Sequence, residues 1–113
     1  LGFATAGNLY PDFLLWLVDE KTGQQHLSLI DPKGIRQMDL TDPKLQLYKE
    51  IKSIEQQLND VKLNLSAFVL SCTGFNSLLN NTQSQQELED KHLLFMEEGG
   101  YKYLPKLFEK MLA

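Results

Sequence analysis

Two aspartates and a lysine are the residues of this sequence whose types and spacing could carry chemistry. Asp12 follows Pro11, and eighteen residues separate it from the segment Asp31-Pro32-Lys33. Carboxylates are oxygen ligands that Mg²⁺ prefers, and a nearby lysine can orient a water molecule or, as a neutral amine, deprotonate it. A bound metal would polarise a phosphoryl oxygen and lower the pKa of a bound water. These side chains could therefore hydrolyse a phosphodiester if the fold brings them together.

The residues between the two aspartates are expected to form a β-hairpin. Residues 13–18 are all apolar, a pattern typical of a strand covered on both faces, so Trp16 is expected in the core. Residues 20–23 form a polar turn whose glycine can take a positive φ. Residues 26–30 then favour a second strand, which ends at Asp31.

A turn centred on Lys21-Thr22 sets the register of this hairpin. Facing residues then have numbers that sum to about 43, so Asp12 faces Asp31 with the two Cβ atoms about 5 Å apart. Lys33 is two residues beyond Asp31 and therefore projects from the same face. Two facing carboxylates repel each other unless a cation bridges them. We therefore predict a metal held by Asp12 and Asp31, with the backbone carbonyl of Pro32 as one more oxygen ligand.

The rest of the sequence predicts further helices and strands. Asp42-Pro43 indicates a helix start, with Asp42 as N-cap, and apolar residues at helical spacing extend this helix to about Asn59. Residues 63–72 return to β character around Phe68-Val69-Leu70. Beyond them we expect a loop at 80–86, a short helix at 85–90, a strand at 92–96 and a terminal helix that contains Leu104, Leu107, Phe108 and Met111. The predicted fold class is α/β, a mixed β-sheet with helices packed on it.

Composition limits the classes of function. The 113 residues have the size of one domain, and the net charge of -4 gives no general attraction to nucleic acid. The single cysteine, Cys72, excludes an internal disulfide and a four-cysteine zinc site, and its apolar neighbours predict a buried thiol. No apolar run is long enough to span a membrane. Because the sequence starts at Leu1 rather than at Met, we expect a piece of a longer protein.

The candidate residues resemble the signature of a nuclease family. Pro11-Asp12, the gap of eighteen residues and Asp31-Pro32-Lys33 are similar to the PD-(D/E)xK motif. The order of hairpin, helix and strand is similar to the core of that family. The segments 94–97 and 107–110 resemble the carboxy-terminal end of type III restriction subunits linked to a DEAD/DEAH helicase. The resemblance covers most of the chain, although only its first 34 residues carry chemistry.

The resemblance implies a single PD-(D/E)xK-like nuclease domain over residues 1–113, with a restriction-endonuclease-like sheet. It implies cleavage of double-stranded DNA that depends on Mg²⁺ or Mn²⁺, with Asp12 and Asp31 as metal ligands and Lys33 as the catalytic lysine. It also implies an ATP-driven helicase region on the amino-terminal side of the parent chain, a modification (methyltransferase) subunit as partner, and the bacterial cytoplasm as location. Family members often carry a further acidic residue on a helix before the hairpin, and this chain starts too late to show it.

Two basic residues are candidate contacts for DNA phosphates. Arg36 is the only arginine and lies just past Lys33. Lys49 lies on the predicted helix after the motif, and a related helix in such nucleases can face the site. A solvated helix face is the alternative explanation for Lys49. His26 and His92 lack the spacing of metal ligands, and we expect them to be structural or exposed.

Three functions stay open at the level of sequence. The first is a metal-dependent DNA endonuclease domain of a restriction-type helicase-nuclease. The second is a nuclease-like domain that has lost catalysis and serves as a DNA-binding or docking module, which the acidic composition allows. The third is an α/β module without a site, because an aspartate before a strand and Asp-Pro-Lys-Gly after one are also ordinary turn chemistry.

Overall fold

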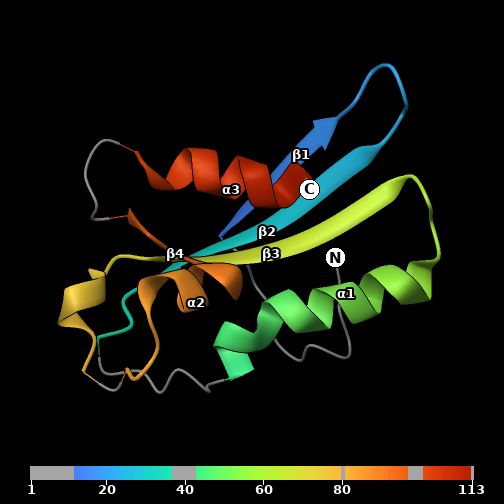
Figure 1. Ribbon diagram of the computed structural model, residues 1–113. Coiled ribbons are helices and arrows are strands. Elements are labelled where there is room, and N and C mark those ends of the chain that lie inside the picture. Colours follow the sequence, from blue (N-terminus) through green and yellow to red (C-terminus); the bar gives the residue numbers. More distant parts are fainter. Residues whose placement is uncertain (1–11, 37–42, 80, 97–100, 113) are drawn as a thin grey trace.

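A four-stranded mixed β-sheet with helices on both faces forms the centre of the structure, which confirms the predicted α/β class (Figure 1). The computed structural model describes residues 12–36, 43–79, 81–96 and 101–112. The elements in chain order are β1 (Phe13–Val18), β2 (Gln25–Lys33), the 3₁₀ turn η2 (Pro43–Gln46), α1 (Leu47–Leu58), β3 (Leu63–Ser71), the 3₁₀ turn η3 (Phe75–Ser77), α2 (Gln85–Asp90), β4 (Leu93–Phe95) and α3 (Tyr103–Leu112). The strands lie in the order β1-β2-β3-β4.

The hairpin of β1 and β2 has the register that the sequence predicts. The two strands are antiparallel, and Phe13 faces Ile30 at the open end of the ladder. At the closed end, the amide of Gly23 donates to the carbonyl of Asp19 at 2.8 Å, and Gly23 has a φ of 76°. A residue with a side chain would be strained there, so the glycine fixes the turn and with it the register.

The other strands are parallel, and this brings several strand ends together. β2 pairs with β3 in parallel through the α1 crossover, and β3 pairs with β4 in parallel. Lys33 at the end of β2 faces Ser71 at the end of β3. One end of the sheet therefore contains the carboxyl ends of β2, β3 and β4 together with the start of β1. In open α/β sheets, ligands bind at the carboxyl ends of the strands.

Helices cover the sheet from both sides (Figure 1). On one face, α1 packs against β2 and β3, and α2 packs beside β4. On the other face, α3 packs across β2, β3 and β4. The almost fully buried side chains that join these layers are Leu29, Ile51, Leu65, Ala67, Phe68, Leu94, Leu107 and Met111. Among the described residues, no helix is both long and apolar enough to cross a membrane.

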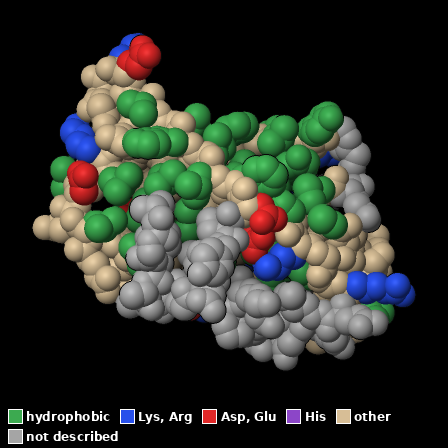
Figure 2. All heavy atoms as spheres, turned by 180° about the vertical axis from the view of Figure 1, so that it is seen from behind, with side chains coloured by type: hydrophobic (Ala, Val, Ile, Leu, Met, Phe, Trp, Pro, Cys, Tyr) green, Lys and Arg blue, Asp and Glu red, His purple; other side chains and the backbone are tan. Residues whose placement is uncertain are grey.

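The prediction that β1 is covered on both faces is wrong. Leu15 and Leu17 pack into the core beneath α3, but Trp16 on the opposite face is 63% exposed. The cause is the position of α1, whose apolar cluster includes residues of β2 and β3 and none of β1. Figure 2 shows hydrophobic side chains along the projecting hairpin and over the adjoining surface.

One smaller prediction is also wrong. Cys72 is exposed rather than buried, because β3 ends at Ser71 and the cysteine lies just beyond it. The predicted N-cap, Asp42, lies outside the described residues. The helix itself begins as a 3₁₀ turn at Pro43 before α1 proper, and it ends at Asn59, which has a left-handed φ of 49°.

Candidate active site

Asp31 and Lys33 form an ion pair at the carboxyl end of β2. The Nζ atom of Lys33 lies 2.7 Å from Oδ2 of Asp31, and the two side chains are 22% and 16% exposed, respectively. Alternate residues of a strand project from the same face, so the pleat of β2 places both groups on the side that carries α1. Because the pair is mostly withdrawn from water, it is less screened than a surface ion pair.

Asp12 lies directly before β1 and is exposed. The amide of Asp19 donates to the carbonyl of Gln24 at 2.8 Å, which marks this pair as a hydrogen-bonded pair of the ladder. Pairs of the two kinds alternate along an antiparallel ladder, so the position of Asp12 and Asp31 belongs to the non-hydrogen-bonded kind, in which side chains approach closest. The register of the hairpin is confirmed, and the shared metal stays a prediction.

The carbonyl of Pro32 is directed toward the β1 side of β2. The amide of Cys72 donates to the carbonyl of Lys33 at 2.8 Å, so the backbone of Lys33 faces β3. Successive residues of a strand turn their backbone groups to opposite sides, and the carbonyl of Pro32 therefore faces the side of Asp12. The last ladder pair is Phe13 with Ile30, so this carbonyl lies past the paired part of β1.

These oxygen donors fit a hard divalent cation. Two carboxylates and one backbone carbonyl match the preferences of Mg²⁺ and Mn²⁺, and a softer metal would favour thiolate or imidazole. Within the described ranges, no three His, Cys, Asp or Glu side chains are close enough together to hold a metal. A cation at Asp31 would therefore depend on backbone, water and phosphate oxygens for the rest of its coordination, as Mg²⁺ commonly does.

Thr73 fixes the segment that follows Lys33, a role that is not predicted from the sequence. The amide of Ile35 donates to Oγ1 of Thr73 at 3.0 Å, and Ile35 is 1% exposed. Thr73 is held in turn by Ser71, whose Oγ donates to the carbonyl of Thr73 at 2.6 Å and accepts its amide at 3.0 Å. The sequence signal for this role is the pair of hydroxyl residues, Ser71 and Thr73, at the end of the strand predicted at 63–72.

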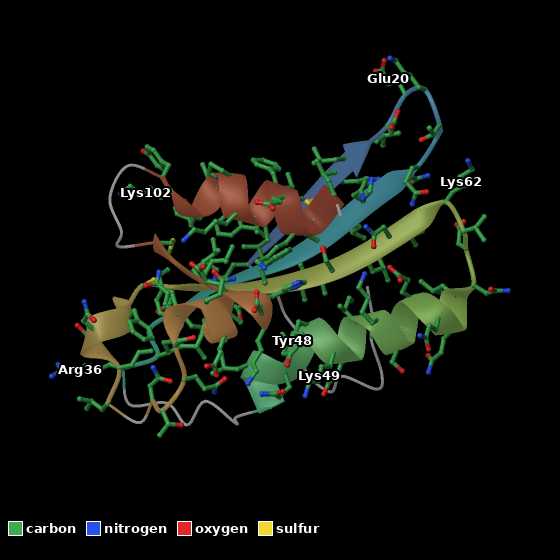
Figure 3. The ribbon with its side chains drawn as sticks, viewed as in Figure 1. Glu20, Arg36, Tyr48, Lys49, Lys62 and Lys102 are labelled. Carbon is green, nitrogen blue, oxygen red and sulfur yellow. The ribbon has the colours of Figure 1, made fainter. Side chains whose placement is uncertain are left out.

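The two predicted DNA contacts lie apart from each other. Arg36 is exposed, and its carbonyl accepts the amide of Leu79 at 3.1 Å. Lys49 is exposed on α1, with its Nζ 5.6 Å from the centre of the Tyr48 ring. Figure 3 shows Arg36 and Lys49 on separate parts of the molecule. A DNA molecule would therefore have to contact Arg36 and Lys49 at two different places on the surface.

Both histidines are structural, and neither belongs to the candidate site. His26 shares a hydrogen bond with Asn64 at 3.1 Å. The ring of His92 stacks on Phe68 with the centroids 4.3 Å apart, and its Nδ1 bonds to the carbonyl of Ala67 at 3.0 Å. Burial lowers the pKa of His92 from its ordinary value, and the hydrogen bond to Ala67 opposes this shift.

An open hollow lies elsewhere on the described surface. It is an open, polar groove of about 330 Å³ between the end of α1 and the start of β3. Glu55 and Asn64 line it, and Glu55 already accepts the amide of Leu65 at 2.5 Å. The groove contains none of the predicted site residues, and its position at the amino end of β3 separates it from the Asp31–Lys33 pair.

Comparisons of the chain with protein-family models, with curated proteins and with solved structures find no match.

Proposed function

We propose that this chain is a metal-dependent endonuclease domain that hydrolyses phosphodiester bonds in double-stranded DNA. The observation that carries the proposal is the Asp31–Lys33 pair at the carboxyl end of β2, with Asp12 next to it in the register of the hairpin. Asp12 lies directly before β1 and Asp31-Pro32-Lys33 ends β2, an arrangement that supports the resemblance to the PD-(D/E)xK nucleases.

In this proposal Asp31 and Asp12 hold Mg²⁺ or Mn²⁺, with the carbonyl of Pro32 as a further donor. The bound metal would supply Lewis-acid activation of the phosphoryl group and of water. Lys33 orients the attacking water or stabilises negative charge on the phosphoryl oxygens, because its ammonium extends from the same face as Asp31. Arg36 and Lys49 serve as outlying contacts to phosphates.

The wider assignments belong to the same proposal. The order hairpin, α1 and parallel β3 supports a restriction-endonuclease-like core within residues 1–113. A helicase region in the parent chain, a methyltransferase subunit as partner and a bacterial cytoplasmic location follow from the resemblance to type III restriction subunits. The net charge of -4 gives the domain no general attraction to a polyanion, so DNA binding would use a local patch, the metal or a neighbouring region of the parent chain.

Calorimetry with Mg²⁺ and Mn²⁺, followed by cleavage of a supercoiled plasmid, tests this function. We expect a divalent ion to bind the wild type with an affinity that Asp31→Ala abolishes. We expect plasmid nicking to require the metal and Lys33. Absence of any divalent affinity in both this chain and a longer parent protein would refute the nuclease proposal.

The second candidate is a nuclease-like domain that has lost catalysis and docks DNA or another protein. The observation that favours it is the acidic balance of 15 Asp and Glu against 11 Lys and Arg, which suits a docking module better than a DNA clamp. Metal binding without nicking by the parent protein would select this candidate over the first.

A further inference from the structure

β1 is an edge strand with uncovered apolar side chains. On the face opposite α3, Leu14, Trp16 and Val18 are 56%, 63% and 55% exposed, which leaves on the order of 300 Å² of apolar surface in contact with water. An area of about 300 Å² is at the low end of the range for the largest patch on a typical monomer, and such patches commonly mark interaction sites. β1 has no charged residue, no proline and no bulge to prevent pairing with another strand.

The same residues direct their backbone groups outward. The bond from the amide of Asp19 to the carbonyl of Gln24 fixes the phase of the β1–β2 ladder. Asp19 directs its backbone groups toward β2, and the direction alternates from residue to residue. The amides and carbonyls of Leu14, Trp16 and Val18 therefore face away from β2. No hydrogen bond from another described residue reaches these groups. Side chains and main chain of β1 are therefore both available to a partner strand.

At the opposite edge of the sheet, the unpaired part of β3 has its backbone groups hydrogen-bonded by side chains. β4 pairs only with the end of β3, so residues 63–68 of β3 also lie at an edge. There, the Oε2 atom of Glu55 accepts the amide of Leu65 at 2.5 Å, and Nδ1 of His92 bonds to the carbonyl of Ala67. Side chains thus form hydrogen bonds with the edge backbone groups of β3. Among the described residues, no side chain does so for the outward-facing backbone groups of β1.

We propose that β1 pairs with β1 of a second copy of this chain, in an antiparallel arrangement that joins the two sheets. The three residues whose backbone groups face away from β2 are Leu14, Trp16 and Val18, and their positions are symmetric about Trp16. A two-fold axis at Trp16 therefore pairs each Leu14 with the Val18 of the other copy, and Trp16 with its own counterpart. All three side chains of one copy then contact only apolar side chains of the other. This self-complementarity favours a second copy over an unrelated partner.

The ends of the strand limit this interface. In the same register Asp12 of one copy faces Glu20 of the other, and like charges that face each other oppose pairing. Pairing is thus restricted to residues 14–18, with about six main-chain hydrogen bonds. The apolar surface is smaller than the roughly 800 Å² per partner of a standard interface, so we expect a weak dimer. Both copies keep the Asp31–Lys33 pair, and the dimer is independent of the proposed nuclease function.

Sedimentation velocity and tryptophan fluorescence over a concentration series test the dimer on the same samples. Trp16 is the only tryptophan, so its emission reports on this strand alone. We expect monomer at ~1 µM and dimer at ~100 µM, as for a small interface, with a blue shift of the emission over the same range. A blue-shifted emission that is independent of concentration would show that the chain itself covers β1, and would overturn the proposal, as would a monomer at every concentration.

Two matched pairs of variants test the position and register of the interface. Trp16→Lys should stay monomeric, because a lysine on an edge strand prevents pairing, whereas Val61→Lys, at a site that is 86% exposed beyond α1, should dimerise normally. In a Cys72→Ser background, Trp16→Cys should form a disulfide-linked dimer, because paired Cα atoms at the axis lie about 5.5 Å apart. Val18→Cys should not cross-link to itself. Dimers of Trp16→Lys, or cross-linking of Val18→Cys alone, would refute this arrangement.

Discussion

The ammonium of Lys33 lies 2.7 Å from the carboxylate of Asp31, two residues away on the same face of β2. In the proposed nuclease, a lysine and a metal ion therefore share one carboxylate. A cation that binds Asp31 must compete with the positive charge of Lys33, and the proximity of the two charges reduces affinity. This relationship separates metal binding from catalysis, because the same lysine opposes the first and is required for the second.

The first prediction concerns Lys33→Met, which keeps the length of the side chain and removes its charge. Plasmid cleavage should fall by about 10²–10⁴-fold, the range for loss of a positioned acid–base group. The affinity for Mg²⁺ or Mn²⁺ should rise severalfold, because Asp31 loses its competing cation. Calorimetry and cleavage assays on the same preparation measure both effects. Lys102→Met, at an exposed position outside the site, is the matched control and should change neither.

The second prediction concerns Asp31→Asn, which retains shape and removes the carboxylate. Metal affinity should be lost, and cleavage should fall to background. The fold should persist with a loss of about 1–3 kcal/mol in the free energy of unfolding, because the pair is mostly withdrawn from water and Lys33 loses its charged partner. Glu20→Gln in the exposed hairpin turn removes the same charge elsewhere and should leave binding unchanged. Equal loss of affinity in both variants would indicate a general charge effect rather than a site.

The third prediction tests the support of the segment after Lys33. Thr73→Val removes the hydroxyl that accepts the amide of Ile35 at 3.0 Å, and that buried amide is left without a partner. The free energy of unfolding should fall by about 1–3 kcal/mol, the cost of an unsatisfied buried donor. Thr73→Ser keeps the hydroxyl and should stay close to wild type in chemical denaturation. Equal stability of the two variants would show that the hydrogen bond contributes nothing.

The sequence was sufficient for the hairpin because local chemistry determines its geometry. Gly23 at a positive φ closes the turn, and a closed turn with a fixed register places Phe13 opposite Ile30 without reference to the rest of the chain. The short helix at Gln85–Asp90 could likewise be predicted from its neighbours, and its N-cap, Ser84, accepts the amide of Glu87 at 3.1 Å. Local signals of this kind need no knowledge of tertiary packing.

Tertiary packing is what the sequence could not provide. An apolar run such as residues 13–18 indicates a strand, but whether both faces are covered depends on where a helix lies. α1 packs over β2 and β3, so Trp16 remains exposed. Similarly, Thr73 was missed because its role depends on Ile35, a residue that is distant in sequence and adjacent only after β2 and β3 pair.

The fourth prediction is a loss of stability at mildly acidic pH that originates at His92. Its ring is stacked on Phe68, and burial lowers its pKa in the folded state below the ordinary value of 6.5. The unfolded chain therefore binds a proton at this residue more readily than the folded chain does. The stability that depends on neutral His92 is fully present above pH 6.5 and is lost as the pH falls toward the folded-state pKa, by up to about 1.4 kcal/mol per pH unit.

Urea denaturation of the wild type and of His92→Asn between pH 7.5 and pH 5, in steps of about 0.5 unit, measures this contribution. Asparagine is suited to the position because it tolerates the left-handed backbone, where His92 has a φ of 63°. The variant should be less stable at pH 7.5, since the stacking on Phe68 is lost, yet its stability should decline less on acidification. Carboxylates titrate in both proteins and cancel in the difference between the two curves. Parallel curves would show that His92 is equally easy to protonate in both states, and an NMR titration of its ring protons would then give an ordinary pKa.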